Sequence, residues 1–323
     1  MQLDYPISAS LLDTLRTGAA VIPDSPTVLA VEGPGSLACL QGLLTNDLVA
    51  PGDGSLTYGA ILTNKGMIVL DPFVLRESGA FVMILPAFAR ETALGHLTRM
   101  LPPRLARVTD RTRAWAAAWL AGPMAGDRLE RAGSSLPAPG RVARLDPGGV
   151  LIATGRAPMP FTAMLVGPSD RVGTLVDRCQ EAGSARGEEA WLAAARVLAG
   201  WPSLGREIDE RTLPQEVRYD ELGAVSYDKG CYTGQETVAR VHFRGHPNRI
   251  LRAVTLEGGG SPGDRTLRYD GREVGMIRTA LLLENRVLAL ATVRREVPDE
   301  AVLRCGDRKA RLAPLPLATE VAV

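Results

Sequence analysis

The sequence has few of the residues that most often build catalytic and metal sites. Its 323 residues include three histidines and four cysteines, and aromatic residues make up only 5%. The cysteines, Cys39, Cys179, Cys231 and Cys305, are far apart and form no C-x-x-C motif. We therefore expect no disulfide framework, no zinc site and no resident cluster, which is typical of a protein from a reducing compartment.

A large net charge and long apolar runs are also missing. Lys and Arg number 37 and Asp and Glu 36, which gives a formal charge of +1. No global field would recruit nucleic acid or an anionic membrane, so an anionic ligand must be bound locally. No window has eighteen uninterrupted apolar residues, and the first residues lack a basic region followed by an apolar stretch. We predict a cytoplasmic protein with no membrane partner.

The length and composition predict more than one folded unit. Hydrophobic residues make up 46% and charged residues 23%, the balance of a globular protein. The chain exceeds the roughly 250–300 residues at which single cores stop growing. We predict an α+β protein with a first α+β unit at 1–114 that is completed by 205–245, a second at 115–204, and a β-barrel at 246–323.

Hydrophobic periodicity predicts alternating strands and helices in the first two units. Strands are expected at 26–31, 58–62, 67–75 and 80–85, and then at 149–154 and 162–167. Helices are expected at 34–44, at 88–101, from an N-cap at Asp170 onward, and at 188–198. Residues 125–140 are rich in Gly, Ala, Ser and Pro without periodicity, which predicts a surface loop.

The third unit shows short strand signals alone. They lie at 251–256, 267–269, 273–279, 287–294 and 301–312, with Asp270-Gly271 as a hairpin turn. Closely spaced strands of this kind predict a small antiparallel barrel.

The segment from Lys229 to Glu236, K-G-C-Y-T-G-Q-E, holds the best candidate for chemistry. Thr233 and Glu236 form a T-x-x-E capping-box pattern, which predicts a helix start near Gly234. Cys231 would then precede the positive end of a helix, with Lys229 two residues upstream, and both features lower the pKa of a thiol. A small residue packed in a glycine-flanked turn explains Cys231 equally well.

The residues in and near this segment allow further interpretations. Cys231 with His242 and His246 lacks a fourth ligand, so we predict no metal site, and no cysteine–histidine pair can be assigned. The arginines between Arg240 and Arg252 form either a solvated face or a clamp for a small anion, and they leave RNA contact open. The acidic run 207–210 either binds the amidine edge of a heterocycle or is a solvated loop.

The K-G-C-Y-T-G-Q-E segment resembles the signature of the YgfZ family of folate-binding proteins, which are relatives of the aminomethyltransferase T-protein of the glycine cleavage system. Three other segments agree: Gln41 to Asp47 (Q-G-x-x-T-N-D), Asn64-Lys65-Gly66 and Leu213-Pro214-Gln215. The resemblance covers nearly the whole chain and is weakest between about 115 and 185.

This resemblance implies a ring of two ferredoxin-like α+β units and a C-terminal antiparallel β-barrel around a hole that binds tetrahydrofolate or a derivative. It also implies work on iron–sulfur clusters of client enzymes, including tRNA-modifying ones, with Cys231 reactive and Lys229 lowering its pKa. The folate contacts expected from it are Asn46, Asp47, Asn64, Asp71, Glu207, Glu210, Tyr232, Gln235, Glu236 and, for the acidic tail, Arg240.

The resemblance leaves an aminomethyltransferase as the runner-up function. A T-protein moves a methylene group from an aminomethyl-lipoyl arm to tetrahydrofolate and carries an acidic pair, of which this chain keeps only Asp71. The C-Y-x-G-Q-E stretch also replaces the T-protein pattern F-x-G-K-E, and Arg218 stands where some YgfZ proteins have asparagine. We therefore expect an accessory protein rather than a classical enzyme, with an RNA-binding module as a third hypothesis.

Overall fold

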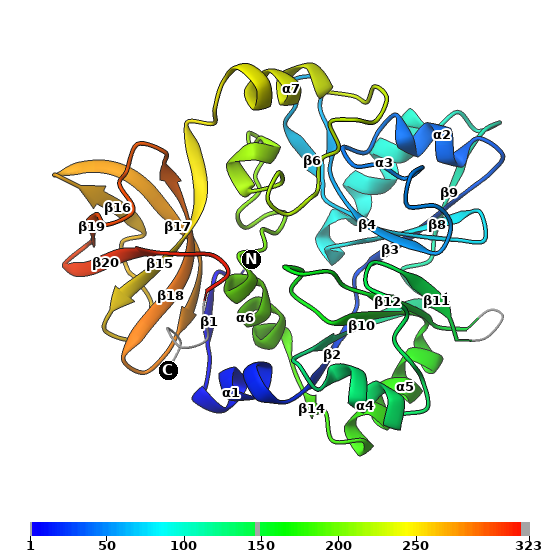
Figure 1. Ribbon diagram of the computed structural model, residues 1–323, viewed down its shortest axis with the longest axis horizontal. Helices are drawn as coiled ribbons and strands as arrows, with labels where there is room; N and C mark the ends of the chain where they lie inside the picture. The colour runs from blue at the N-terminus through cyan, green and yellow to red at the C-terminus, as the bar shows by residue number, and fades with distance from the viewer. Residues whose placement is uncertain (1, 146–148, 318–323) are drawn as a thin grey trace.

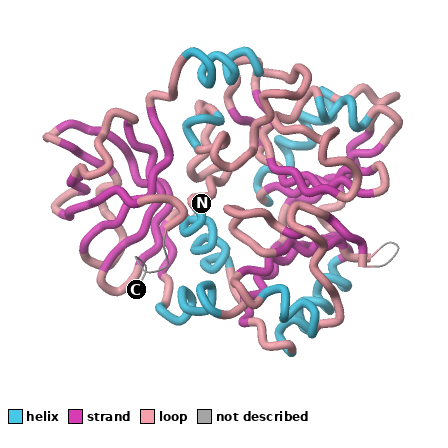
Figure 2. Tube along the Cα trace, viewed as in Figure 1, coloured by secondary structure: helices cyan, strands magenta, loops and turns pink. Residues whose placement is uncertain are grey.

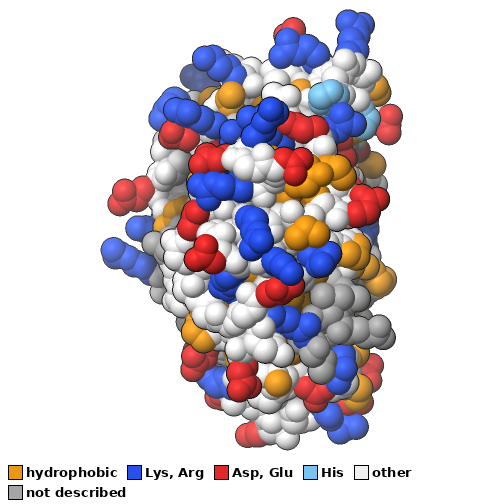
Figure 3. Space-filling view, turned by 90° about the vertical axis from the view of Figure 1, so that its left-hand side faces the viewer, with side chains coloured by type: hydrophobic (Ala, Val, Ile, Leu, Met, Phe, Trp, Pro, Cys, Tyr) orange, Lys and Arg blue, Asp and Glu red, His pale blue; other side chains and the backbone are white. Residues whose placement is uncertain are grey.

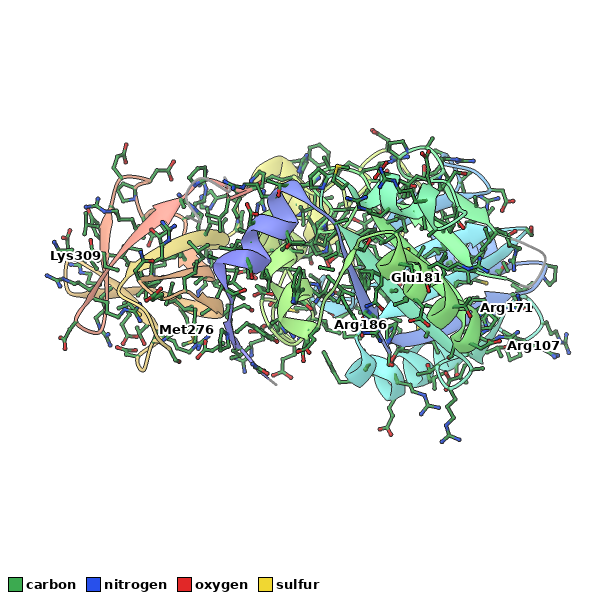
Figure 4. All side chains as sticks on the ribbon, turned by 90° about the horizontal axis from the view of Figure 1, so that it is seen from below. Arg107, Arg171, Glu181, Arg186, Met276 and Lys309 are labelled. Atoms are coloured by element: carbon green, nitrogen blue, oxygen red, sulfur yellow. The ribbon has the colours of Figure 1, made fainter. Side chains whose placement is uncertain are left out.

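The computed structural model describes residues 2–145 and 149–317. The molecule is elongated, with a β-barrel at one end and two sheet-and-helix units at the other (Figures 1 and 2). Seen from below, the barrel carries Met276 and Lys309, and Arg107 marks the far end (Figure 4). This arrangement confirms the predicted α+β class with a C-terminal barrel. Residue 1 and residues 318–323 of the predicted units lie outside the described residues.

The first sheet has five antiparallel strands and is buried on both faces. Their order is β4 (Ser55–Tyr58), β7 (Phe73–Glu77), β8 (Ala80–Leu85), β3 (Thr27–Glu32) and β9 (Arg107–Asp110). On β3, Leu29 and Val31 pack in one core with Leu97, while Val28 packs in the core between the two sheets. Two buried faces explain why this strand reads as a continuous apolar run.

Helices cover one face of the first sheet. They are α2 (Ser36–Gln41), the short 3₁₀ helix η1 (Ala87–Ala89) and α3 (Arg90–Met100), and a two-stranded ribbon of β5 (Ile61–Leu62) and β6 (Ile68–Leu70) lies beside them. The predicted helices at 34–44 and 88–101 are confirmed in kind, with shorter bounds.

The second sheet has six strands. Their order is β11 (Val142–Arg144), β12 (Leu151–Thr154), β13 (Ala163–Pro168), β10 (Trp115–Ala121), β2 (Ala20–Asp24) and β14 (Ala185–Arg186). Its helices are α4 (Ala125–Arg131) and α5 (Ser169–Glu181).

Two predictions for the second unit were wrong. Residues 125–131 of the predicted surface loop form α4, because Ala125, Leu129 and Ala132 recur at helical spacing and are buried in the core beneath it. The helix expected from an N-cap at Asp170 already begins at Ser169, without a side-chain cap.

The third unit is a closed barrel of six antiparallel strands, as predicted. The strands are β15 (Arg249–Glu257), β16 (Thr266–Tyr269), β17 (Arg272–Leu282), β18 (Arg286–Arg294), β19 (Val302–Cys305) and β20 (Arg308–Ala313), and the pairing of β18 with β17 closes the ring. The single strand expected at 301–312 is two strands, because the chain turns at Gly306, where φ is +58°.

The N-terminal segment connects the units. Strand β1 (Asp4–Pro6) pairs in parallel with β17 of the barrel, helix α1 (Ala9–Thr17) follows, and β2 then joins the second sheet. Short strands carry no sequence signal for a distant partner, so these pairings could not be predicted. The proposed boundaries of the units stay predictions.

The chain between residues 200 and 234 runs through the middle of the molecule to helix α7 (Gln235–Arg244). It follows α6 (Glu189–Ala199) and contains only one short regular element, the 3₁₀ helix η2 (Pro214–Val217). Its side chains Trp201, Ile208 and Tyr219 are buried in the core between the sheets. This segment therefore carries the K-G-C-Y-T-G-Q-E motif to the start of α7. No helix in the described part of the chain is long and apolar enough to cross a membrane.

Candidate functional site

Two of the motif segments, which are distant in sequence, meet in space. The Thr45 hydroxyl donates to the carbonyl of Ala224 at 2.7 Å, and the Asn46 side-chain amide donates to that of Gly223 at 2.7 Å. The Thr233 N–H donates to the Gly42 carbonyl at 3.1 Å. The segments 41–47 and 223–238 therefore form one hydrogen-bonded unit, which we call the motif cluster.

Lys229 is the centre of the motif cluster. Its ammonium donates to the main-chain carbonyls of Gln41, Leu44 and Asn46 at 2.6, 2.6 and 3.0 Å. Burial lowers the pKa of Lys229 to about 8, and the nearby carboxylate of Asp47 opposes that shift. All three donors of the ammonium are used on these carbonyls, so the structure gives Lys229 a positioning role. Its predicted effect on the thiol of Cys231 stays a prediction.

Helix α7 begins where predicted, but its cap is different. The N-cap is Gly234 at φ +83°, with no side-chain cap, so the capping box of Thr233 and Glu236 was wrong. A Cβ on Gly234 would lie 2.5 Å from the carbonyl oxygen of Thr63. The close approach of the 63–66 turn therefore requires glycine at the cap, which moves it one residue past Thr233.

Cys231 is exposed and free, just before α7. Its neighbour Tyr232 is buried, with the ring centre 5.2 Å from the ammonium of Lys229, and the Tyr232 N–H donates to the side-chain oxygen of Gln235 at 3.3 Å. The backbone on one side of the thiol is therefore fixed while the thiol itself is open to a bulky partner.

A second group of residues surrounds Asp71 in the middle of the molecule, and we call it the central chamber. Asp71 is buried; its Oδ2 accepts from the Leu204 N–H at 3.2 Å, and its Oδ1 has no partner. The chamber, about 30 Å³, also contains Arg196, and its aromatic walls are Tyr58, Phe73, Trp119 and Trp201. An adjoining cleft of about 330 Å³ shares Asp24, Pro86 and Arg196 with the chamber.

The central chamber holds a carboxyl group, that of Asp71, and a guanidinium group, that of Arg196, and each has one atom without a hydrogen-bond partner. Burial raises the pKa of Asp71 to about 7, while Arg196 and the Leu204 N–H oppose that shift. Burial also lowers the pKa of Arg196, whose Nε has no partner and whose Nη1 donates to the Ser203 hydroxyl at 2.7 Å. The pair suits a polar ligand that offers both a donor and an acceptor.

Three further residues predicted to contact folate already have internal partners. Glu207 accepts from the Thr279 hydroxyl at 2.5 Å and from the Ser203 N–H at 3.0 Å. The bond to Thr279 joins the segment 200–234 to the barrel. Asn46 and Asp47 bond within the motif cluster; Asp47 accepts from the Gln41 side chain at 2.9 Å and from the Val49 N–H at 2.8 Å. These side chains stabilise the loops beside the two groups.

The remaining predicted residues are at the surface. The exposed set consists of Asn64, Glu210, Glu236 and Arg240. Asn64 lies in the turn that packs on Gly234, and Glu236 and Arg240 lie on α7, so three of the four border the motif cluster. Glu210 follows Asp209, which is tied to Thr212 and Arg278.

Of the residues named for the central chamber, the sequence predicted Asp71 alone; its aromatic walls and Arg196 were missed. Arg196 lies in the otherwise apolar stretch of α6, and a lone arginine there was an available signal. Trp201 is recognised only in the structure, where its ring centre lies 4.6 Å from that of Tyr58 and 5.8 Å from that of Phe73.

Replacing Lys229 tests its positioning role. Lys229→Met leaves three main-chain carbonyls without their donor, so the free energy of unfolding should fall by about 2–3 kcal/mol. Lys65→Met, which removes an exposed lysine from the same region, should change it by less than about 0.5 kcal/mol. Urea unfolding measures both values, and equal losses would show that Lys229 is not the structural centre of the cluster.

The raised pKa of Asp71 predicts a pH dependence of stability. The folded state holds the Asp71 proton up to about pH 7, whereas the unfolded chain releases it near 3.8, so Asp71 stabilises the fold at low pH and loses that effect between about pH 4 and pH 7. Asp71→Asn removes this loss, which amounts to about 1.4 kcal/mol per pKa unit. The unfolding free energy of Asp71→Asn relative to wild type should therefore rise across this range, and the exposed control Asp270→Asn should show no such trend. A constant difference would contradict the assignment.

Comparisons with known proteins agree with this architecture. Residues 13–137 match the GCVT N-terminal domain family. An aminomethyltransferase of Rubrobacter xylanophilus is 27% identical over 299 residues, 89% of this chain and 80% of its own length. The tRNA-modifying protein YgfZ of Cronobacter sakazakii is 26% identical over 304 residues, 90% of this chain and 91% of its own.

A solved structure shares the whole fold. The aminomethyltransferase T of the glycine cleavage system from Bartonella henselae superimposes with a TM-score of 0.81 over 99% of this chain and 92% of its own, at 18% identity. The predicted resemblance to YgfZ proteins and to the aminomethyltransferase T-protein is thereby confirmed. The chain is therefore similar to YgfZ proteins and aminomethyltransferases over most of its length.

Proposed function

We propose that this protein is a cytoplasmic folate-binding accessory of the YgfZ type. In this proposal tetrahydrofolate or a derivative binds at the central chamber, and Cys231 acts on iron–sulfur client enzymes, including ones that modify tRNA. The observation that carries it is the buried Asp71 oxygen that lacks a donor among aromatic rings. Such an orphaned acceptor is costly in a folded protein and indicates a ligand that supplies the donor.

The chemistry of the central chamber fits a pterin. A flat heterocycle with N–H donors and a carbonyl acceptor matches the aromatic walls, the free oxygen of Asp71 and the free Nε of Arg196. The chamber beside Asp71 is only about 30 Å³, but the adjoining cleft of about 330 Å³ falls in the range of small-molecule sites. Arg196 borders both spaces, so we infer that its side chain moves when the ring enters. Bound tetrahydrofolate would supply a carrier for a one-carbon unit.

Cys231 supplies a nucleophilic or redox-active thiol in this proposal. Its exposure admits a large partner, and it lies in the loop directly before α7. In the described residues, no three His, Cys, Asp or Glu side chains gather in a metal-binding arrangement. The proposal therefore assigns the cluster to the client enzyme, as substrate.

One observation favours aminomethyltransferase activity as the second candidate. Asp71 has a pKa of about 7, which suits an acid or base that works near neutral pH, and it lies in the chamber. In that case Asp71 would move a proton on the folate, and Cys231 would not be needed. The two candidate functions thus differ in whether Cys231 is required.

Folate titration tests the central chamber. Calorimetry with tetrahydrofolate should show saturable binding to the wild type and affinity at least about tenfold weaker for Asp71→Asn, which loses one acceptor beside the ring. Asp53→Asn, an exposed aspartate outside the chamber, should bind like the wild type. Equal affinities for all three proteins would place the folate elsewhere.

Complementation tests the thiol. In a strain whose iron–sulfur enzymes fail because its own YgfZ protein is deleted, the wild type and Cys39→Ala should restore enzyme activity, whereas Cys231→Ala should not. Rescue by Cys231→Ala would reject the role of this cysteine. Turnover with a lipoyl carrier and tetrahydrofolate that is lost in Asp71→Asn and kept in Cys231→Ala would favour the transferase instead.

A further inference from the structure

A cavity of about 470 Å³ lies in the seam between the barrel and the segment 214–221. One wall comes from β15 and the chain that follows β20, and the other from η2 and Glu221; β15 packs directly against η2. In Figure 1 this seam lies between the barrel and the yellow-green segment below α7. None of its lining residues borders the central chamber or the adjoining cleft. The seam cavity is therefore a separate space.

Two arginines with restrained side chains line the seam cavity. Arg218 is 9% exposed, and its Nη1 donates to the carbonyl of Gly200 at 2.9 Å. Its backbone has φ +66°, a left-handed conformation that is uncommon for arginine and is set by the end of η2. Arg252 projects from β15 with a side chain that is 18% exposed. The guanidinium of Arg218 is thus held at the cavity by the Gly200 carbonyl, and Arg252 lines the cavity from β15.

The acids that pair with these arginines are more exposed than the arginines. Arg218 Nε donates to the carboxylate of Glu221 at 2.8 Å, and Arg252 bonds to that of Asp299. The side chains of Glu221 and Asp299 are 65% and 82% exposed. Ion pairs with such exposed carboxylates contribute little to stability, so an incoming anion can replace both acids.

Gln215 adds a side-chain oxygen that accepts no hydrogen bond within the protein. Its Nε2 donates to the carbonyl of Val238 at 3.0 Å, and because a carbonyl only accepts, this contact fixes which end of the amide is the oxygen. Gln215 lines the cavity, is 8% exposed, and its buried Oε1 has no partner. A ligand with an O–H or N–H group would satisfy this oxygen.

We propose that the seam cavity binds a small oxyanion that carries its own hydrogen-bond donor. Arg218 and Arg252 would bind the anionic oxygens, and Gln215 would accept from the donor. Hydrogen phosphate is the simplest member of this class. Basic and acidic side chains are interspersed over the barrel face in Figure 3, so a general positive field does not account for such binding.

Paired calorimetric titrations with phosphate and sulfate near neutral pH test the proposal, because the two anions share shape and charge but only hydrogen phosphate has a P–OH donor. The wild type should bind phosphate at least about tenfold more tightly than sulfate, and Gln215→Met should lose this preference. Arg252→Gln should weaken phosphate binding about tenfold. Arg249→Gln, an exposed arginine of the same strand outside the cavity, should change it by less than about twofold. Asp299→Asn should strengthen it, because a competing carboxylate is removed.

Three results would overturn the proposal: no saturable phosphate binding by the wild type, equal affinity for the two anions, or equal effects of Arg249→Gln and Arg252→Gln. Thermal unfolding of each variant controls for loss of fold, and the Asp299→Asn arm decides the matter if Gln215→Met is unfolded. Tetrahydrofolate affinity should be unchanged in Arg252→Gln, which separates this site from the proposed folate site.

Discussion

The ammonium of Lys229 is the interaction on which the motif cluster depends. It replaces the water that would otherwise bond three carbonyls of the segment 41–46, and it reaches them from a loop about 185 residues away in sequence. Because a buried carbonyl without a donor is costly, this one side chain fixes the relative position of two motif segments. Cys231 and the start of α7 follow directly on the loop that Lys229 holds.

In contrast to the ammonium of Lys229, the buried polar groups of the central chamber are not all hydrogen-bonded. Asp71 and Arg196 are buried with hydrogen-bonding groups left unused, although the surrounding core is otherwise packed with aromatic side chains. A fold that only maximised its stability would satisfy or remove such groups. Their presence between two well-packed sheets is the reason for proposing a ligand at this site.

Much of the fold could be predicted from local pattern. The strands at 80–85 and 287–294 and the helix at 188–198 were predicted close to their bounds, since their periodicity and flanking turn residues are strong. Helix α4 was missed because it has only seven residues and begins a segment, 125–140, that is rich in Gly, Ala, Ser and Pro; its buried Leu129 packs in a core that the sequence does not reveal. The cap of α7 was misassigned because the conformation of Gly234 is imposed by the turn at 63–66, which lies far away in sequence.

The sequence by itself determined the fold class, the barrel and the identity of the motif that ends in α7, because these depend on residue types at short, regular spacing. The tertiary structure alone decided that Lys229 bonds carbonyls, that burial raises the pKa of Asp71, and that Arg196 shares its chamber. Those properties arise from burial and from groups separated by more than a hundred residues. Exclusion of solvent and the distance to other charged groups set the energy of a charged group, and local sequence determines neither of them.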